Sequence, residues 1–440
     1  MRFFYLILFF TLKYSLRIYY PRNKSVNSPK GFFGRTIYVS NHAASFMDPL
    51  VVASMRKPIV FFMTRSDVFT RFTRPFLWAA HMLPIYRQHD GVDTKDENVK
   101  VFDQCANILS YGRNLLIFGE GFTDDVFIRR LKPLKKGAAR IGFNALEKLN
   151  WKKKIYLAAV GCNYSDPNTI GSDLLVSTSK RICLNDYQQE FIENPNKVIT
   201  EVTKLLENML KEQITHIEDK NMANFHENIM KLTRKGMNAL HSNTKIPLVN
   251  RWHYSQNLAN WLNQQTAESL EILTHLKNEM ESYFSLLRKL RMNENYVFEL
   301  SQHHKLNRTK ELLSLILLAP FAILGLIHCG LPYFLIKRFV EKSFKRRVFW
   351  GSVKLILGMI VMGLINIPAI FLFYNCVYPS YLLGFLYYAL IGFFGLAAYK
   401  WWKNFLQFRE KGVVMKTDVT KIVAKRKALT EQIEATIPIQ

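Results

Sequence analysis

Three long apolar runs near the C-terminal end of the sequence restrict what this chain can fold into. They cover residues 312–336, 352–374 and 381–399, and a helix needs about 20 apolar residues to cross a bilayer. A backbone in lipid has no water to bind, so such runs fold as helices that satisfy their own N–H and C=O groups. Aromatic residues at the ends of the runs are typical of a membrane interface; they are Trp350, Tyr399, Trp401 and Trp402. The sequence therefore predicts a helical membrane region over residues 311–402.

The charges between the runs predict their orientation. One basic loop covers residues 337–347 and another covers residues 400–411, whereas the turn at residues 375–379 is uncharged. Positive residues favour the cytoplasmic side of a membrane. We therefore expect both basic loops, and the tail at residues 403–440, on that side.

The first run contains residues that can break a helix, namely Pro320, Gly325, Gly330 and Pro332. If the preceding part of the chain is also cytoplasmic, this run has to enter and leave the membrane by the same face. Irregular backbone at membrane depth is tolerated where neighbouring helices shield it. A re-entrant segment is therefore expected, with a plain span as the alternative.

Charge and cysteine content restrict the partners. The chain has 440 residues, long enough for two or three units, and its net charge of +26 calls for an anionic partner. No zinc-finger spacing, RNA-binding aromatic motif or P-loop accompanies that charge, so we expect an anionic membrane surface and no nucleic acid. The five cysteines form no C-x-x-C pair, which is typical of reduced thiols and predicts neither a metal site nor a disulfide framework.

Residues 1–20 mix apolar, aromatic and basic side chains over a helical length. The uninterrupted apolar run, residues 3–10, is too short to span a bilayer. No small-residue cleavage site follows it, as a secretory signal would require. The segment predicts an interfacial helix that lies in the membrane surface, with a cleaved signal as the alternative.

Apolar or β-branched runs alternate with helical candidates in the middle of the chain. The expected strands cover residues 36–40, 58–63, 115–119, 155–162 and 174–178. The expected helices cover residues 49–55, 94–110, 135–149 and 197–216. This alternation predicts an α/β domain, a mixed sheet flanked by helices. In such sheets polar site residues collect at strand ends, and His42 and Glu120 each follow an expected strand.

His42 and Asp48 are the first candidates for chemistry. If they touch, the carboxylate fixes the imidazole tautomer and stabilises its protonated form, which leaves the other ring nitrogen free to take a proton. No Gly-x-Ser-x-Gly elbow is present, so the hydroxyl would belong to a substrate. Positions six apart lie roughly 120° from each other around a helix, so a turn has to bring the pair together. The alternative is a polar turn in which Asp48 caps the next segment.

When the sequence blocks that follow His42 and Asp48 are included, residues 30–215 resemble the glycerol-phosphate and lysophosphatidate acyltransferase family. That family has an Asn-His…Asp block, then an Arg-bearing block, then a Phe-Pro-Glu-Gly-type block. The chain has, in this order, Asn41-His42 with Asp48, Leu83-Pro-Ile-Tyr-Arg87 with Asp90, and Ile117-Phe-Gly-Glu-Gly-Phe-Thr123. The apolar strand expected at residues 155–162 falls where the last family block would be.

The departures from the family pattern point to one branch of it. Five residues separate His42 from Asp48 where the family usually has four, and Gly119 replaces the proline of the third block. The arginine common after that block is missing, and Asp124 and Asp125 follow instead. These features look like the branch that acylates glycerol 3-phosphate or dihydroxyacetone phosphate.

The resemblance implies a membrane O-acyltransferase of glycerophospholipid synthesis, with a catalytic domain at residues 30–217 on the cytoplasmic face. His42 would be the general base and Asp48 would orient it. The donor would be a fatty acyl thioester of coenzyme A or acyl carrier protein, and the acceptor glycerol 3-phosphate or its 1-acyl form. No metal or other cofactor is expected.

The resemblance also implies an acceptor pocket. Arg87 would grip the acceptor phosphate with two hydrogen bonds. Glu120 and Gly121 would shape the pocket and Thr123 would add a hydrogen bond. Lys135 and Lys136 would stand at a helix N-terminus, which favours an anion.

Residues 218–306 are polar, with apolar residues at helical spacing, and Pro247 divides them. We expect a helical arm between the catalytic domain and the membrane region. Two other functions stay open. One is acylation of a different lipid acceptor, such as an amino-acid lipid, and the other is a non-catalytic membrane scaffold with a degenerate acyltransferase domain.

Overall fold

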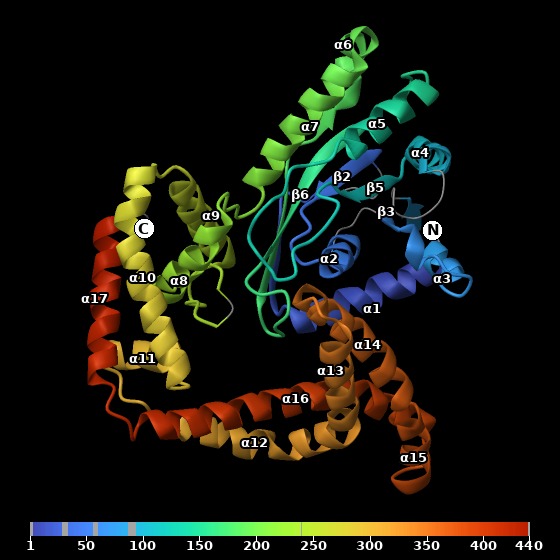
Figure 1. The fold of residues 1–440 in the computed structure, drawn as a ribbon. Coiled ribbons are helices and arrows are strands. Elements are labelled where there is room, and N and C mark those ends of the chain that lie inside the picture. Colours follow the sequence, from blue (N-terminus) through green and yellow to red (C-terminus); the bar gives the residue numbers. More distant parts are fainter. Residues whose placement is uncertain (1–2, 29–33, 56–59, 87–93, 239, 439–440) are drawn as a thin grey trace. The chain divides into compact units, whose positions relative to one another are not determined.

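The computed structural model describes residues 3–28, 34–55, 60–86, 94–238 and 240–438 (Figure 1). The chain forms two compact units. The first unit comprises Met1–His226 and Lys235–Gln264, and the second comprises Glu227–Arg234 and Gln265–Gln440. The first contains the sheet and the second is helical, so the predicted fold class, a mixed α/β sheet with flanking helices and a helical C-terminal region, is confirmed.

The sheet of the first unit follows the order β1-β7-β6-β2-β5-β3-β4, with β8 paired to β6. The strands are β1 (Arg22–Val26), β2 (Thr36–Ser40), β3 (Val60–Arg65), β4 (Met82–Ile85), β5 (Asn114–Phe118), β6 (Tyr156–Tyr164), β7 (Asp173–Thr178) and β8 (Ile182–Cys183). Strand β2 is central and parallel to both β5 and β6, whereas β7 and β8 run antiparallel to β6. All five residues of β2 are buried, as expected for a strand covered on both faces.

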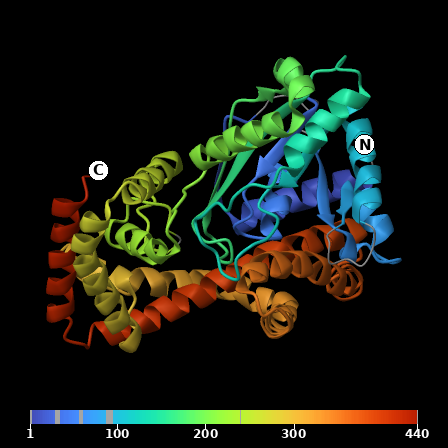
Figure 2. The same cartoon turned by 45° about the horizontal axis from the view of Figure 1, so that its top comes forward.

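Helices cover both faces of this sheet (Figures 1 and 2). They are α1 (Phe3–Tyr19), α2 (Met47–Met55), α3 (Arg74–Ala79), α4 (Thr94–Ser110), α5 (Gly137–Lys148), α6 (Gln188–Glu193), α7 (Pro195–Glu212), α8 (Ala223–Thr233, shared between the units) and α9 (Leu248–Asn263). The main core joins Ile37 and Val39 of β2 to apolar residues of α4, α5, α6 and α7. Side chains alternate along a strand, so Tyr38 and Ser40 point to the opposite face, where α2 contacts β6 and α1 packs on α2.

Three strands were not predicted: the edge strands β1 and β4, and the two-residue strand β8. Strand β1 falls in a polar, basic stretch, and it pairs in parallel with β7 at the edge of the sheet. Strand β4 is the opposite edge, and it is four residues long with Pro84 inside it. A proline is tolerated there because an edge strand need not donate every N–H. None of the three has the long apolar run by which the central strands were predicted.

Helix α9 lies with the sheet, although the sequence suggested a separate arm. Its Arg251 is 1 % exposed and bonds to the fully buried Asp173 of β7. Asp173 also accepts from Arg22 of β1. A buried carboxylate needs such partners, so this Arg–Asp–Arg cluster fixes α9 and β1 to β7. The predicted arm at residues 218–306 is therefore divided between the two units.

The second unit contains the apolar helices. Its remaining helices are α10 (Ala267–Lys289), α11 (Glu294–Ser301), α12 (Thr309–Gly325), α13 (Leu331–Ser343), α14 (Trp350–Ile365), α15 (Pro368–Cys376), α16 (Tyr381–Val414) and α17 (Thr420–Thr436). Three helical runs are long and apolar enough to cross a membrane: Thr309–Ser343, Arg347–Cys376 and Tyr381–Val414. The predicted helical, membrane-compatible character of this region is confirmed.

The first of these runs, Thr309–Ser343, stays helical at the prolines and glycines that were expected to break it. A π-helical turn, Leu326–Gly330, joins α12 to α13, and the helix changes direction there (Figure 1). Helix α12 packs along α16 while α13 packs along α14. Gly325 permits the first contact, since a Cβ there would lie 2.0 Å from the carbonyl oxygen of Phe394. The re-entrant path of this segment stays a prediction.

Candidate active site

His42 and Asp48 meet across the turn that links β2 to α2. The distance from His42 Nδ1 to Asp48 Oδ2 is 3.2 Å, and the side chains are 21 % and 0 % exposed. The chain turns through Ser45, whose φ is +51°, before α2 begins at Met47. The two residues therefore do not share one helix, as their spacing required. The imidazole also lies against the ring of Phe118 at the end of β5, with ring centroids 4.4 Å apart.

Three donors converge on the Asp48 carboxylate. Besides His42, the backbone N–H of Ala44 donates to Oδ2 at 2.9 Å and the Tyr164 hydroxyl donates to Oδ1 at 2.9 Å. Burial raises the pKa of Asp48 above its ordinary value, and donation from His42, Tyr164 and Ala44 opposes that shift. The carboxylate is thus fixed in position from three directions, and it points at Nδ1 of the imidazole.

Glu120 connects the His42 turn to the loop that precedes α5. Strands β2 and β5 are parallel neighbours, so their carboxyl ends meet at one edge of the sheet. Glu120 Oε1 accepts from the His42 backbone N–H at 2.5 Å, and Oε2 accepts from the Lys132 backbone N–H at 3.1 Å. Burial raises the pKa of Glu120, and these two backbone donors oppose the shift. Both carboxylate oxygens therefore hold backbone in place.

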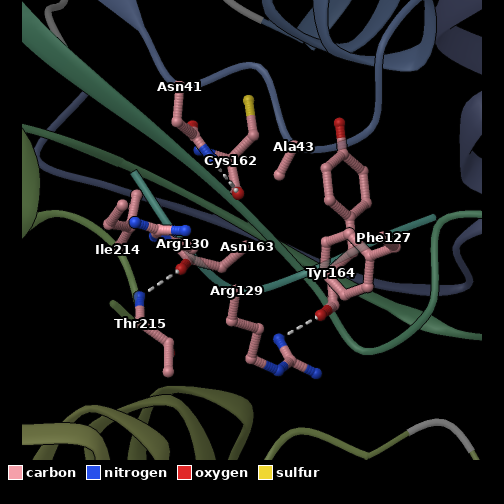
Figure 3. Close-up of a pocket in the computed structure, with 10 residues that line it drawn as sticks. All are labelled: Asn41, Ala43, Phe127, Arg129, Arg130, Cys162, Asn163, Tyr164, Ile214 and Thr215. Carbon is pink, nitrogen blue, oxygen red and sulfur yellow. Dashed lines mark hydrogen bonds between the residues drawn. The ribbon is translucent and has the colours of Figure 1, made fainter. Parts of the chain in front are cut away.

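Asn41 continues the β2–β6 pairing beyond the last residue of β2. Its side chain accepts from the Cys162 N–H at 2.8 Å and donates to the Cys162 carbonyl at 3.1 Å. Figure 3 shows this pair beside a small cavity that Arg130, Asn163 and other residues line. Its volume of about 10 Å³ is room for about one water. The asparagine therefore anchors the start of the turn that carries His42.

The structure brings several predicted pocket residues to this turn. Lys135 donates its backbone N–H to the Gly119 carbonyl at 2.9 Å, and a Cβ on Gly121 would lie 2.9 Å from its Nζ. Gly121 has a φ of +76°, which favours glycine, and Thr123 is buried just beyond it. These residues form one compact block next to His42.

One predicted pocket residue stands apart from that block, and another lies outside the described residues. The Lys136 ammonium donates to Thr200 Oγ1 of α7 at 2.7 Å, so it is engaged by a helix on the core face rather than by the residues around His42. Arg87, together with Asp90, lies outside the described residues.

The sequence did not reveal two residues that support the site, Tyr164 of β6 and Arg129 of the loop before α5. Tyr164 and Arg129 are both buried. The Arg129 guanidinium donates to the carbonyl of Tyr164 (Figure 3) and also to those of Ser165 and Met237. The partners lie far from His42 in the sequence, so no local spacing indicates them. The one available signal was the two polar residues, Asn163 and Tyr164, at the end of an otherwise apolar strand.

Part of the first unit matches a known protein family. No curated protein matches the chain. Residues 23–162 match the family model described as Acyltransferase, a span that includes His42, Asp48 and Glu120. The match, together with the sheet that places these residues at one edge, supports an acyltransferase domain in the first unit.

Proposed function

We propose that this chain is a membrane O-acyltransferase in which His42 is the general base and Asp48 orients it. The observation that carries the proposal is the contact from His42 Nδ1 to a fully buried Asp48 that two further donors hold. A carboxylate facing Nδ1 favours the tautomer with the proton on Nδ1. The lone pair on Nε2 is then free to accept a proton from a substrate hydroxyl.

The reaction runs as a direct transfer between two substrates. As the acceptor oxygen attacks the thioester carbonyl carbon, its proton moves to His42 Nε2 and Asp48 stabilises the imidazolium. The carbon–sulfur bond of the tetrahedral intermediate then breaks. The leaving thiolate takes the proton back from Nε2, so an ester and a free thiol are formed and the base is regenerated.

The substrates we propose are a fatty acyl thioester of coenzyme A or acyl carrier protein, and a glycerol-phosphate or lysophospholipid hydroxyl. The block that Glu120, Gly121 and Thr123 form beside His42 supports this choice, because the resemblance assigns it to the acceptor pocket. Lys135, whose Nζ would lie 2.9 Å from a Cβ on Gly121, is proposed as one cation of that pocket, and Arg87 is proposed as the second. We further propose that the first unit faces the cytoplasm.

Purified protein, an acyl-coenzyme A donor and a panel of acceptors test the proposal. The panel contains glycerol 3-phosphate, dihydroxyacetone phosphate, 1-acyl-glycerol 3-phosphate and a lyso amino-acid lipid. His42→Ala should lower kcat by about 10²–10⁴-fold because the general base is lost. His275→Ala, a change at an exposed histidine, is the matched control. Near-normal turnover by His42→Ala would remove the catalytic assignment, and no turnover of any acceptor by the unaltered protein would favour a scaffold.

A further inference from the structure

Helix α1 is apolar on two opposite faces, and the first unit covers only one of them. One face packs against α2 and α3; its buried residues are Tyr5, Leu16 and Tyr19. At about 100° per residue, a second set falls within roughly 80° on the other side of the helix. This outer stripe is exposed and consists of Phe3, Ile7, Phe10, Tyr14 and Ile18. A helix that is hydrophobic all round belongs inside a protein core or in lipid.

A second exposed apolar segment lies beside the start of α1. Phe4 of α1 and Phe76 of α3 have ring centroids 6.1 Å apart. Phe72 is 84 % exposed, Phe76 is 62 % exposed and Trp78 is 58 % exposed. Large aromatic side chains at such exposure, gathered within one short segment, form a patch rather than the scattered apolar residues of an ordinary surface.

Basic side chains accompany both segments. On α1, Arg17 and Lys13 flank one edge of the outer stripe, roughly 60° and 100° from its centre. A groove of about 650 Å³ lies in the second segment, and its lining residues are Phe69, Arg71, Arg74, Pro75 and Trp78. Neither Arg71 nor Arg74 forms an ion pair within the described residues. Exposed aromatics next to unpaired cations are complementary to a layer that is apolar below and anionic at its surface.

We infer that the outer stripe of α1 and residues 69–78 form one lipid-binding surface, by which the first unit docks on an anionic phospholipid bilayer. The aromatic side chains enter the headgroup–acyl boundary, and the arginines and Lys13 contact lipid phosphates. The second unit has three helical runs that are apolar and long enough to cross a membrane, so a bilayer is available to the same chain. This inference is independent of the reaction proposed for His42.

Photo-crosslinking of the full chain in lipid nanodiscs tests the surface. Benzoylphenylalanine replaces Phe72 or Phe10 in nanodiscs of phosphatidylglycerol and phosphatidylcholine. The control replaces Ile192, which is 68 % exposed on α6, at the far end of the first unit from α1 (Figure 1). We expect lipid adducts from positions 72 and 10 and none from position 192. Adducts to protein at positions 72 and 10, whether to the same chain or to a second copy, would overturn the inference.

Charge removal tests the anionic preference separately. Arg71→Gln and Arg74→Gln should each lower the ratio of phosphatidylglycerol to phosphatidylcholine adducts at position 72 by about fivefold. Lys197→Gln and Lys204→Gln each remove the same charge from an exposed position on α7 and should leave that ratio unchanged. An unchanged ratio in the arginine variants would overturn the role of the groove. Phe72 is so exposed that its replacement should not disturb folding, which thermal unfolding of each variant checks.

Discussion

At the scale of single residues, the proposed base is positioned by side chains from a distant strand. Tyr164 of β6 lies 116 positions from Asp48 in the sequence, yet its hydroxyl donates to the carboxylate that faces His42. Full burial of both residues keeps water from replacing that donor. A hydrogen bond to a charged group contributes about 1.5–3 kcal/mol. Tyr164 should therefore act as a positioning residue for the reaction.

We predict that Tyr164→Phe lowers kcat by about tenfold. It should also move the acidic limb of the kcat/KM profile to higher pH, because donation from Tyr164 lowers the pKa of Asp48 and its loss lets Asp48 take a proton more readily. Tyr20→Phe is the matched control, since Tyr20 is equally buried but donates to the Pro167 carbonyl. Equal pH profiles for the two variants would contradict the positioning role.

A second residue makes stability depend on pH. Burial, together with nearby Lys211, lowers the pKa of His216 to about 4, and its Nδ1 accepts from the Leu131 N–H at 3.0 Å. The unfolded chain takes this proton near pH 6.5, so the native state loses stability as the pH falls from about 6.5 to about 4, by up to about 3 kcal/mol.

His216→Asn keeps an acceptor for Leu131 and removes the titration. We predict that the loss of unfolding free energy between pH 7 and pH 4.5 becomes smaller by about 2–3 kcal/mol in this variant, as measured by denaturant titration of the detergent-solubilised protein. His275→Asn, at an exposed position, should retain the full pH dependence. An identical slope in the two variants would show that other groups carry it.

At the scale of elements, the sequence predicted the strands and helices that have a long, local pattern of apolar residues. Strand β2 and helix α4 have the expected bounds, and the other central strands are within two residues of theirs, because buried runs and helical periodicity are local signals. The turn between His42 and Asp48 followed from their spacing. Edge strands β1 and β4 were missed because one is polar and the other is short.

The supports of the site could not be predicted in the same way. Tyr164, Arg129 and the Asn41–Cys162 pair depend on which strand lies next to β2, and only the sheet order reveals that neighbour. The place of α9 in the first unit depends likewise on the buried contact between Arg251 and Asp173. The sequence of a polar helix does not indicate that one of its arginines pairs with a carboxylate far away along the chain.

The turn after β5 yields a test of one short element. Gly121 has a φ of +76°, and a Cβ at this position would lie 2.9 Å from Lys135 Nζ. We predict that Gly121→Ala lowers the unfolding free energy by about 1–2 kcal/mol and raises the acceptor KM, since Lys135 has to move. Gly137→Ala is the control, because nothing lies within 4 Å of a Cβ at that helical position, and it should be neutral or slightly stabilising. Thermal unfolding and acceptor titrations measure both effects.

At the scale of the whole molecule, each unit contains a buried carboxylate that pairs with two arginines and so joins distant elements of that unit. In the first unit this is Asp173 with Arg22 and Arg251. In the second it is Glu294 of α11, with Arg234 just after α8 and Arg426 of α17. Arg426 also donates to the Leu232 carbonyl at 2.9 Å. The second cluster therefore closes its unit by joining the C-terminal helix to the segment Glu227–Arg234, which precedes it by almost 200 positions.

Loss of Arg426 should consequently affect the second unit alone. Removal of one partner from a buried ion pair costs about 3–5 kcal/mol, because a carboxylate is left without compensation. We predict that Arg426→Met makes amide hydrogens exchange faster throughout α10, α11 and α17, which pack together, while those of β2, β5 and β6 keep their protection. Lys427→Met, which removes a charge from the neighbouring position that makes only an exposed contact with His303, is the matched control. Hydrogen exchange with mass spectrometry resolves these segments. Faster exchange in the sheet as well would mean that the two units unfold together. Unchanged exchange in α17 would mean that its apolar face, in which Leu429 and Ile433 are buried, holds the helix in place without the arginine.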